Sequence, residues 1–493
     1  MRFMFDTKQA EDYRRFLAIR KCPVYRFEGW QAVVPDEYAA MLGVGLTQSE
    51  CDTYEPTTGM FDYQRDIARL AIQKRKFAIF ADCGLGKTLM LLEFARHAAK
   101  QAGKRALIVA PLMVVEQTVE EAAKWYGDSL SIGQVRAADL QYWLNSTDSL
   151  DTQIGVTNYE AIREGLTPGN LGALILDESS MLKNHYGEWG LRLIELGRGL
   201  QWKLCASGTP APNDRIEYAN HAVFLDRAKT TNEFLATYFI NRGETQNRWE
   251  LKPHGLKPFY RSLSDWSIFL TNPATYGWCD NVGTTPPIHI HVEHIELTAE
   301  QRAASQKITG SLMANSVGGI GQRGKLSQIA KGKGGMPTLK PQAIRALVDS
   351  WPGESTIIWC HYNDEQEQME RTFPEAVSIA GDTPMDKRRS AIAAFKSGAA
   401  KVLISKPKVL GFGLNLQVCT RQVFSGLKDS YEEFYQAVKR SNRIGSTKPL
   451  NVHIPVTELE VPFVDNVLRK SHRVECDAAE QEALFREVRH VVE

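Results

Sequence analysis

The sequence predicts an α/β protein with two parallel β-sheets in tandem. Short apolar runs alternate with amphipathic helical stretches from about residue 60 to residue 206, and the same alternation restarts near residue 355. A strand–helix–strand repeat of this kind indicates parallel strands in a sheet that helices cover on both faces. The stretch between the two repeats is basic and rich in glycine, which indicates an insertion between two sheet domains.

The elements follow in order along the chain. We expect strands at 77–81, 106–110, 154–157, 173–176 and 203–206 in the first repeat, and at 356–360, 376–379, 402–405, 422–425 and 451–455 in the second. Helices are expected at 88–100, 364–373 and 384–395. The predicted organisation is an accessory segment (1–55), a first domain (56–235), a basic insertion (236–345), a second domain (346–456) and a C-terminal helical segment (457–493). From Asp477 this last segment is amphipathic and acidic, so we expect it to pack on the second domain.

Composition excludes several classes of protein. The 493 residues include 59 Lys and Arg against 58 Asp and Glu, a net charge of +1, so any nucleic-acid contact must come from a local patch. None of the eight cysteines forms a CxxC pair, which excludes a zinc ribbon or disulfide scaffold. The most apolar stretch, 106–115, is too short to span a membrane, and charges interrupt the N-terminus too early for a signal peptide. We therefore expect a protein of a reducing compartment, the cytoplasm of a bacterium or of a host cell.

A phosphate-binding loop is expected at 81–88, ADCGLGKT, between a strand and a helix. Gly84 and Gly86 would let backbone N–H groups turn toward phosphates, and the helix N-terminus adds its dipole. Lys87 would reach the β- and γ-phosphates, and the Thr88 hydroxyl would ligate Mg²⁺. A helix-capping turn that matches by chance is the alternative, because Ala81 replaces the usual first glycine.

Two carboxylates end the strand in LILDESS, 174–180. The carboxyl end of a parallel strand lies at the sheet edge where ligands bind, so these carboxylates are expected beside the phosphate loop. Asp177 would hold Mg²⁺ through water, and Glu178 would activate the attacking water. An ordinary strand followed by an acidic helix start is the alternative.

Two arginines in QAVKRSNRIG, 436–445, complete the predicted chemistry. Arg440 and Arg443 are three residues apart and share a helical face. Arginines from a second domain neutralise charge that develops on the γ-phosphate when the cleft closes. An exposed basic helix is the alternative for this segment taken alone.

The stretch 301–348 has no Asp or Glu but eight Lys and Arg, a local charge of +8. We expect Arg323, Lys325, Lys331 and Lys333 to contact nucleic-acid phosphates. A solvated loop is the alternative. In IHIHVEHIEL, 288–297, His289, His291 and Glu293 share one side of a predicted strand; an ordinary strand with one buried face explains them better than a metal site.

These motifs resemble, in order, those of superfamily II helicases, and among them the Swi/Snf-type DNA translocases. The matching segments are FDYQ (61–64), LIVAP (107–111), TNYE (157–160), DESSMLKN (177–184), SGTPAPN (207–213), GFGLNLQ (411–417) and the arginine segment. The similarity covers about residues 58 to 455, and GLNLQ followed by QxxxRxxRIG is specific to this branch. Ser180 stands where the family usually has His, and Gln117 stands where Trp is common.

The resemblance implies two RecA-like domains that hydrolyse ATP with Mg²⁺ and step along duplex DNA. The residues that it implies are, for ATP, Gln64, Asp82, Cys83, Gly84, Leu85, Gly86, Lys87, Thr88 and Gln436; for hydrolysis, Lys87, Glu178, Arg440 and Arg443; for the metal, Thr88 and Asp177; for coupling, Ser207, Gly208 and Thr209; and for DNA, Thr157, Asn158, Gly413 and Asn415. Cys83 is either a reactive thiol or a small filler in the loop.

The short spacer between the two repeats favours a compact translocase of bacterial or viral type over a nucleosome remodeller. Two rival functions stay open at this point. One is a helicase that separates strands with the same motor. The other is an ATP-driven switch or loader that acts with a nuclease or a replication partner.

Overall fold

The computed structural model describes residues 1–6, 8–22, 25–34, 42–44, 54–147, 152–183, 187–243, 249–279, 285–310, 320–410, 415–443 and 446–490. The chain forms two compact units, the first from Met1–Asn281 with Val474–Glu493 and the second from Val282–Arg473. In the described residues, no helix is both long and apolar enough to cross a membrane. The predicted domain boundaries at 235, 345 and 456 stay predictions.

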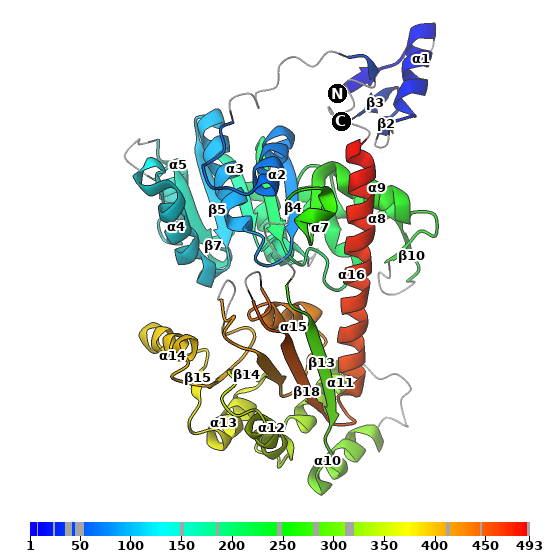
Figure 1. Cartoon of the computed structure of the whole chain (residues 1–493). Helices are drawn as coiled ribbons and strands as arrows, with labels where there is room; N and C mark the ends of the chain where they lie inside the picture. The colour runs from blue at the N-terminus through cyan, green and yellow to red at the C-terminus, as the bar shows by residue number, and fades with distance from the viewer. Residues whose placement is uncertain are drawn as a thin grey trace. The chain divides into compact units, whose positions relative to one another are not determined.

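The first unit is built on a seven-stranded sheet in the order β12-β4-β9-β8-β5-β7-β6, and all its pairs are parallel (Figure 1). Its strands are β12 (Ser267–Leu270), β4 (Lys76–Ala81), β9 (Trp202–Ser207), β8 (Leu171–Asp177), β5 (Arg105–Ala110), β7 (Ile154–Asn158) and β6 (Ile132–Gln134). Its helices are α2 (Asp62–Lys74), α3 (Lys87–Ala102), α4 (Leu112–Tyr126), α5 (Leu140–Asn145), α6 (Glu188–Leu196), α7 (Tyr218–Phe224), α8 (Thr231–Tyr238) and α9 (Leu256–Trp266).

The five strands predicted for this sheet are confirmed, while two of its strands lie outside the prediction. Strand β6 has the sequence IGQ and so no apolar run, and strand β12 has the sequence SIFL but lies outside the strand–helix repeat. Strand β12 falls within the predicted insertion, yet it is paired in parallel with β4 at the edge of the first sheet. It brings Leu270 O next to Asp82 N, at 2.9 Å, and so supports the start of the phosphate loop.

The second unit carries a six-stranded parallel sheet in the order β13-β18-β17-β14-β16-β15. Its strands are β13 (Ile288–His294), β18 (Leu450–Val456), β17 (Arg421–Phe424), β14 (Thr356–Trp359), β16 (Val402–Ser405) and β15 (Val377–Ile379), and its helices include α13 (Asn363–Thr372), α14 (Met385–Ser397) and α15 (Tyr431–Val438). These elements confirm the predicted α/β class with two parallel sheets in tandem.

Strand β13 differs from the expected strand with one buried face. Residues 289–292 are all exposed, so side chains on both faces of the strand meet solvent. The reason is its position, because β13 is the edge strand and pairs only with β18 among the described residues.

The N-terminal segment forms a small antiparallel sheet in the order β1-β3-β2 with one helix. The elements are β1 (Arg2–Met4), α1 (Ala10–Ile19), β2 (Arg26–Glu28) and β3 (Gln31–Val33). Ile19, Cys22 and Ala32 form its buried centre. A two-stranded ribbon in the first unit, β10 (Phe239–Asn241) with β11 (Trp249–Leu251), is also antiparallel.

The basic stretch is helical over much of its length, with α10 (Ala299–Gly310), α11 (Ile320–Ala330) and α12 (Lys340–Asp349). The C-terminal helix α16 (Val461–His490) is confirmed as a helix, but the prediction that its end packs on the second unit is wrong. Asp477 pairs with Arg215 at 2.5 Å, and Glu482 accepts hydrogen bonds from Thr271 N and Oγ1 at 2.6 and 2.7 Å. Amphipathicity marks a helix face that is buried, but it does not identify the partner.

Strand β7 provides a test of packing in the first sheet. A Cβ atom on Gly155 would lie 2.8 Å from Trp143 and from Val135, closer than van der Waals contact allows. We expect Gly155→Ala to destabilise the first unit by about 1–3 kcal/mol because overpacking forces these neighbours to move. At roughly 2–4 °C per kcal/mol for a unit of this size, the thermal midpoint should fall by several degrees. Gly381→Ala is the control, since its Cβ would meet open space; equal midpoints for the two variants would contradict this packing.

Candidate ATP site

The loop between β4 and α3 has the local structure that phosphate binding needs. Lys87, the first residue of α3, folds its ammonium back to donate hydrogen bonds to Ala81 O at 2.6 Å and Asp82 O at 3.0 Å. Gly84 and Gly86 have φ values of 92° and 67°, in the left-handed region that favours glycine. A Cβ on Gly86 would also collide with Gln64 Nε2. The loop thus keeps a cation and an exposed backbone at the N-terminus of a sixteen-residue helix.

Helix α2 supports this loop from one side. Tyr63 OH and Gln64 Nε2 both donate to Leu85 O, at 3.1 and 3.4 Å. Gln64 Oε1 accepts from Phe61 N at 3.0 Å, which fixes the first turn of α2. Gln64 is only 5% exposed, so the structure brings this predicted residue against the phosphate loop. Asp82 and Cys83 are half-buried within the loop, and Cys83 N donates to Asp82 Oδ1 at 2.6 Å.

The acidic pair lies at the carboxyl end of β8, as predicted. Asp177 is 9% exposed, and burial raises its pKa to about 7; the Glu178 carboxylate adds to this rise and Lys87 opposes it. Tyr159 OH donates to Asp177 O at 2.8 Å and so holds the end of the strand. Glu178 follows with φ 56°, a left-handed conformation that is uncommon for a residue other than glycine.

Two hydroxyls hold the Glu178 carboxylate. Ser207 Oγ donates to Glu178 Oε1 at 2.7 Å, and Ser180 Oγ donates to the same oxygen at 3.1 Å. Ser207 ends β9 and accepts from Thr209 N at 3.0 Å, so the predicted coupling segment is tied directly to the predicted water-activating carboxylate. Thr209 Oγ1 is buried and has no hydrogen-bond partner in the described part of the chain.

The residues of this site fit ATP with Mg²⁺. Lys87 holds an ammonium against the backbone of the loop, and Asp177 is a carboxylate whose pKa burial raises although Lys87 opposes the rise. Thr88 lies in the first turn of α3, half-buried, where its hydroxyl would complete the metal ligands. A bound Mg²⁺ would supply positive charge to Asp177 and to the phosphate oxygens.

The arginine segment of the second unit is brought together with the GLNLQ segment. Leu416 N donates to Arg440 O at 2.9 Å, and Arg443 Nε donates to Lys439 O at 2.8 Å. Arg440 is buried, while Arg443 and Gln436 are half-buried. Gln436 Nε2 has no hydrogen-bond partner among the described residues. Asn415 is exposed at the start of this segment, and Gly413 lies outside the described residues.

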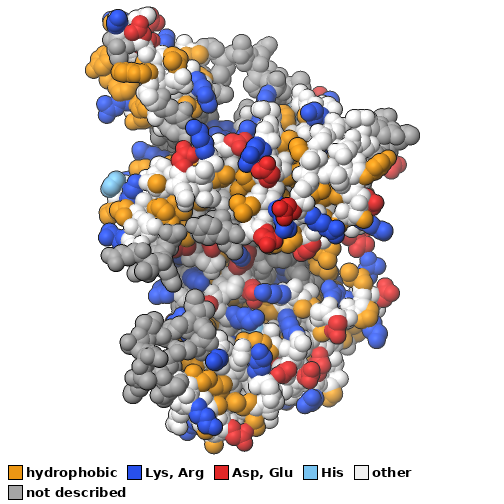
Figure 2. Space-filling view, turned by 180° about the vertical axis from the view of Figure 1, so that it is seen from behind, with side chains coloured by type: hydrophobic (Ala, Val, Ile, Leu, Met, Phe, Trp, Pro, Cys, Tyr) orange, Lys and Arg blue, Asp and Glu red, His pale blue; other side chains and the backbone are white. Residues whose placement is uncertain are grey.

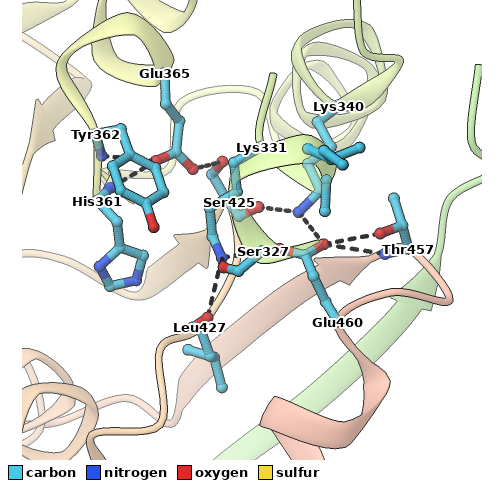
Figure 3. A network of polar contacts seen from close by, with 12 residues as sticks. Ser327, Lys331, Lys340, His361, Tyr362, Glu365, Ser425, Leu427, Thr457 and Glu460 are labelled. Atoms are coloured by element: carbon cyan, nitrogen blue, oxygen red, sulfur yellow. Dashed lines mark hydrogen bonds and ion pairs between the residues drawn. The ribbon is translucent and has the colours of Figure 1, made fainter. Parts of the chain in front are cut away.

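Two of the predicted DNA contacts are wrong. Thr157 is 1% exposed and its hydroxyl donates to Val135 O at 2.8 Å, so its side chain serves the interior of the first unit. Lys331 is 1% exposed and its ammonium pairs with Glu460 at 3.1 Å (Figure 3). The absence of acids within 301–348 did not reveal this pair, because Glu460 comes from a distant part of the sequence.

The other predicted DNA contacts lie nearer the surface. Arg323, Lys325 and Lys333 are exposed, and Asn158 is half-buried. Arg323 lies 3.8 Å from Asp429, and Lys333 lies over the ring of Tyr362 at 5.3 Å. Over the face drawn in Figure 2, basic side chains are interspersed with acidic ones, as the net charge of +1 suggests.

Two polar side chains of β13 make pairwise contacts with β18. His291 Nε2 lies 3.1 Å from Asn451 Oδ1, and Glu293 Oε1 lies 2.7 Å from His453 Nδ1. In the described residues, no group of three or more His, Cys, Asp or Glu side chains could hold a metal ion.

Sequence reasoning missed residues that support the acidic pair from elsewhere in the fold. Tyr159 holds the end of β8, and its position in TNYE was the available signal. His221 of α7 lies 3.1 Å from Ser179 Oγ, and burial lowers its pKa to about 4, so the ring is neutral. Thus a histidine lies beside this motif in space, although Ser180 occupies the sequence position where the family usually has one. Nothing in the sequence near 221 indicates this contact.

Two family models match the chain. The SNF2-related domain matches residues 32–253, and the helicase conserved C-terminal domain matches residues 339–445. The chain therefore carries a SNF2-related domain followed by a helicase C-terminal domain, the two parts of a Swi/Snf-type ATPase. The matched ranges contain the phosphate loop, the acidic pair and the arginine segment described above.

A curated relative and two solved structures are similar to the chain. The ATP-dependent helicase FUN30 of Saccharomyces cerevisiae is 26% identical over 293 residues, which cover 51% of this chain and 23% of the yeast protein. The Sulfolobus solfataricus SWI2/SNF2 ATPase core in complex with dsDNA is 19% identical with a TM-score of 0.39, and covers 91% of this chain and 99% of its own. The core domain of the same ATPase is 20% identical with a TM-score of 0.38, and covers 83% and 88%.

The Glu178 contacts give a prediction about hydrolysis. Glu178→Gln removes the carboxylate that would accept a proton from water, so ATP should still bind while turnover falls by about 10²-fold or more. Nucleotide binding by equilibrium titration and steady-state turnover check the two halves separately. Lys87→Ala is the comparison variant and should lose ATP binding itself, because the phosphates lose their cation. Normal turnover in Glu178→Gln would mean that another group activates the water.

Proposed function

We propose that this ATPase is a motor that uses ATP hydrolysis to translocate along duplex DNA. The observation that carries the proposal is the 2.7 Å hydrogen bond between Ser207 of the coupling segment and Glu178 of the acidic pair. Through Thr209 N, which donates to Ser207 Oγ, a change at the γ-phosphate would reach the backbone that follows β9. A motor needs a side chain that contacts the γ-phosphate site and changes the backbone conformation when ATP is hydrolysed.

In this proposal, the first unit binds ATP with Mg²⁺. Lys87 contacts the β- and γ-phosphates, Thr88 and Asp177 hold the metal, and Glu178 positions and deprotonates the attacking water. Gln64, at the edge of the loop, contacts the base. The buried Thr209 hydroxyl, which has no partner in the described residues, adds a polar group near this centre.

The second unit would supply positive charge to the transition state. Arg440 and Arg443 follow α15 and are held next to the GLNLQ segment through Leu416 N. Charge that develops on the γ-phosphate is stabilised most when a cation arrives with its geometry already fixed. Gln436, on the same helix, would contact the nucleotide.

The partner in this proposal is duplex DNA. The SNF2-related and helicase C-terminal domains support a nucleic-acid partner, as does the name of the curated relative. Exposed Arg323, Lys325 and Lys333 of the basic stretch would contact phosphates, with Asn158 of the first unit and Asn415 of the second at the DNA backbone.

The decisive experiment measures the ATPase rate with no nucleic acid, single-stranded DNA, duplex DNA and RNA. The proposal expects the largest stimulation with duplex DNA, together with ATP-dependent displacement of a triplex-forming strand. Equal rates in all four conditions would contradict it. Unwinding of a forked duplex would assign the chain to strand-separating helicases instead.

Arg443→Ala tests the role of the second unit. Turnover should fall by about 10³-fold or more if this side chain stabilises the transition state. ATP affinity should stay close to that of the unchanged protein, because the proposed binding residues of the first unit precede residue 215. Steady-state turnover and nucleotide titration check this, and equal losses in both would contradict a role confined to the transition state.

A triple variant tests the basic surface. Replacing Arg323, Lys325 and Lys333 with Gln should weaken binding to all DNA sequences alike, because phosphate contacts carry no sequence information. Each lost contact should lower the slope of log K against log salt by roughly 0.9, so the triple variant should lower it by between about 2 and 3. Lys21, Lys257 and Lys401, which are also exposed, form a control set with the same change in net charge. The same slope for both sets would contradict a specific phosphate-binding surface.

A further inference from the structure

The connection between β17 and α15, residues 425–430, is held by polar side chains from three helices or their ends. Lys331 directly follows α11, Lys340 begins α12, and Glu460 directly precedes α16. Figure 3 shows the three side chains converging beside Ser425 and Leu427. Two of the three belong to the basic stretch that the sequence associated with DNA.

Glu460 is the centre of this network. Its Oε1 lies 3.1 Å from Lys331 Nζ, its Oε2 lies 2.6 Å from Lys340 Nζ, and each of the three residues is at most 1% exposed. Burial opposes ionisation of Glu460, but Lys340 and Lys331 outweigh it and hold the pKa of this carboxyl below its usual range. A buried carboxylate that stays ionised keeps both lysines in place.

Both lysines also donate hydrogen bonds to the backbone of the connection, and Lys331 Nζ donates in addition to Ser327 Oγ at 2.6 Å. Lys340 Nζ donates to Ser425 O, and Lys331 Nζ donates to Leu427 O at 3.0 Å. A Cβ on Gly426, between these two carbonyls, would collide with Glu460 Oε1 and lie 2.5 Å from Lys331 Cε. Residues 425–427 therefore pass through the network with no room for a side chain at the central position.

Asp429, the next residue but one in the connection, is held by two side chains of α16. Asn466 Nδ2 donates to Asp429 Oδ1 at 3.0 Å, and Lys470 Nζ donates to Asp429 O at 2.8 Å, both from α16. Ser430 then caps α15 by accepting from Glu433 N at 3.3 Å. The chain is thus fixed from the end of β17 to the first turn of α15.

The far end of α15 is tied to the same strand. Gln422 Nε2, on β17, donates to Ala437 O at 3.0 Å and to Ser441 Oγ at 2.8 Å. Ser441 lies between Arg440 and Arg443 in the sequence. A displacement of the end of β17 would therefore move both ends of α15 and the turn that carries the two arginines.

We propose that Lys331, Lys340 and Glu460 are positioning residues for ATP turnover, which fix the β17–α15 connection and through it the arginine turn. The inference rests on the proposed role of Arg440 and Arg443 in hydrolysis. It gives the basic stretch an intramolecular task, because its buried lysines hold the segment that leads to the arginines while its exposed side chains stay available to a partner.

A purely stabilising network is the alternative, and the chemistry argues against it. Ionic groups in an interior are poor stabilisers compared with apolar side chains of similar volume, because desolvation offsets their attraction. The hydrogen bonds to the carbonyls on either side of Gly426 fix the backbone conformation there more narrowly than apolar packing would. A catalytic group misplaced by about 1 Å loses up to about a hundredfold in rate.

The test compares Glu460→Gln with Glu458→Gln, an exposed carboxylate two residues earlier. Three quantities are measured on the full chain: ATP affinity, the ATPase turnover number, and amide hydrogen exchange of residues 425–443. We expect Glu460→Gln to lower turnover between about tenfold and a hundredfold while ATP affinity stays within twofold. Hydrogen exchange should rise in 425–443 and remain unchanged in the first unit. Glu458→Gln should change none of the three quantities.

A folded Glu460→Gln variant with unchanged turnover would overturn the proposal, as would parallel losses of affinity and turnover. If Glu460→Gln does not fold, the double variant Asn466→Ala with Lys470→Met decides, because its contacts with Asp429 lie outside the buried centre. A selective loss of turnover in the double variant supports positioning through this connection, and unchanged turnover rejects it.

Arg443→Ala, measured in parallel, separates this inference from the proposed function. If Arg443→Ala leaves turnover unchanged, the assignment of the arginines fails, and with it the link to hydrolysis. The hydrogen exchange of residues 425–443 in Glu460→Gln then still reports whether the network holds the connection. Unchanged exchange there would reject the structural half of the inference as well.

Discussion

In a parallel sheet every strand brings its carboxyl end to the same edge, and this constraint decides where polar side chains gather in both units. In the first unit β4, β8 and β9 end at Ala81, Asp177 and Ser207, and the phosphate loop, the acidic pair and the coupling segment follow directly. In the second unit β17 and β18 end at Phe424 and Val456, and the charged network follows them. Residues far apart in the sequence become neighbours because their strands are neighbours.

The buried carboxylates at the carboxyl edges of the two sheets differ in the charges that surround them. At the edge of the first sheet, burial raises the pKa of the Asp177 carboxyl to about 7, the Glu178 carboxylate adds to the rise and Lys87 opposes it. The Thr209 hydroxyl there has no hydrogen-bond partner among the described residues. Such an arrangement suits a site completed by a ligand that brings its own cation. At the edge of the second sheet, Glu460 is matched by two lysines of the same chain. The same two lysines also donate to the backbone carbonyls of Ser425 and Leu427.

The sequence was sufficient to predict the central strands, because these depend on local patterns. The residues assigned to phosphate stay a prediction, but the loop that carries them lies between a strand and a helix, as its pattern indicated. The apolar run of five residues that precedes GLGKT predicts a strand, and GLGKT itself predicts a phosphate loop and the start of a helix. Strand β12 escaped prediction because it lies in the stretch taken as an insertion, outside both strand–helix repeats, and pairs with β4, a strand far earlier in the sequence. The burial of Lys331 and the approach of His221 to Ser179 depend on contacts between distant segments. The lack of acidic residues around Lys331 therefore predicted an exposed phosphate contact and gave no indication that its side chain is buried.

The exposed edge of β13 has a consequence for handling the protein. This strand presents unpaired backbone groups along its outer side within the described structure, and Ile290 and Val292 are 41% and 39% exposed. An open edge with apolar side chains is a template on which another extended chain can add as a further strand. The interspersed His289, His291 and Glu293 reduce this tendency by keeping polar groups along the edge. Concentrated preparations should therefore be more prone to self-association when these polar positions are replaced by apolar residues than when equivalent changes are made on a helix surface.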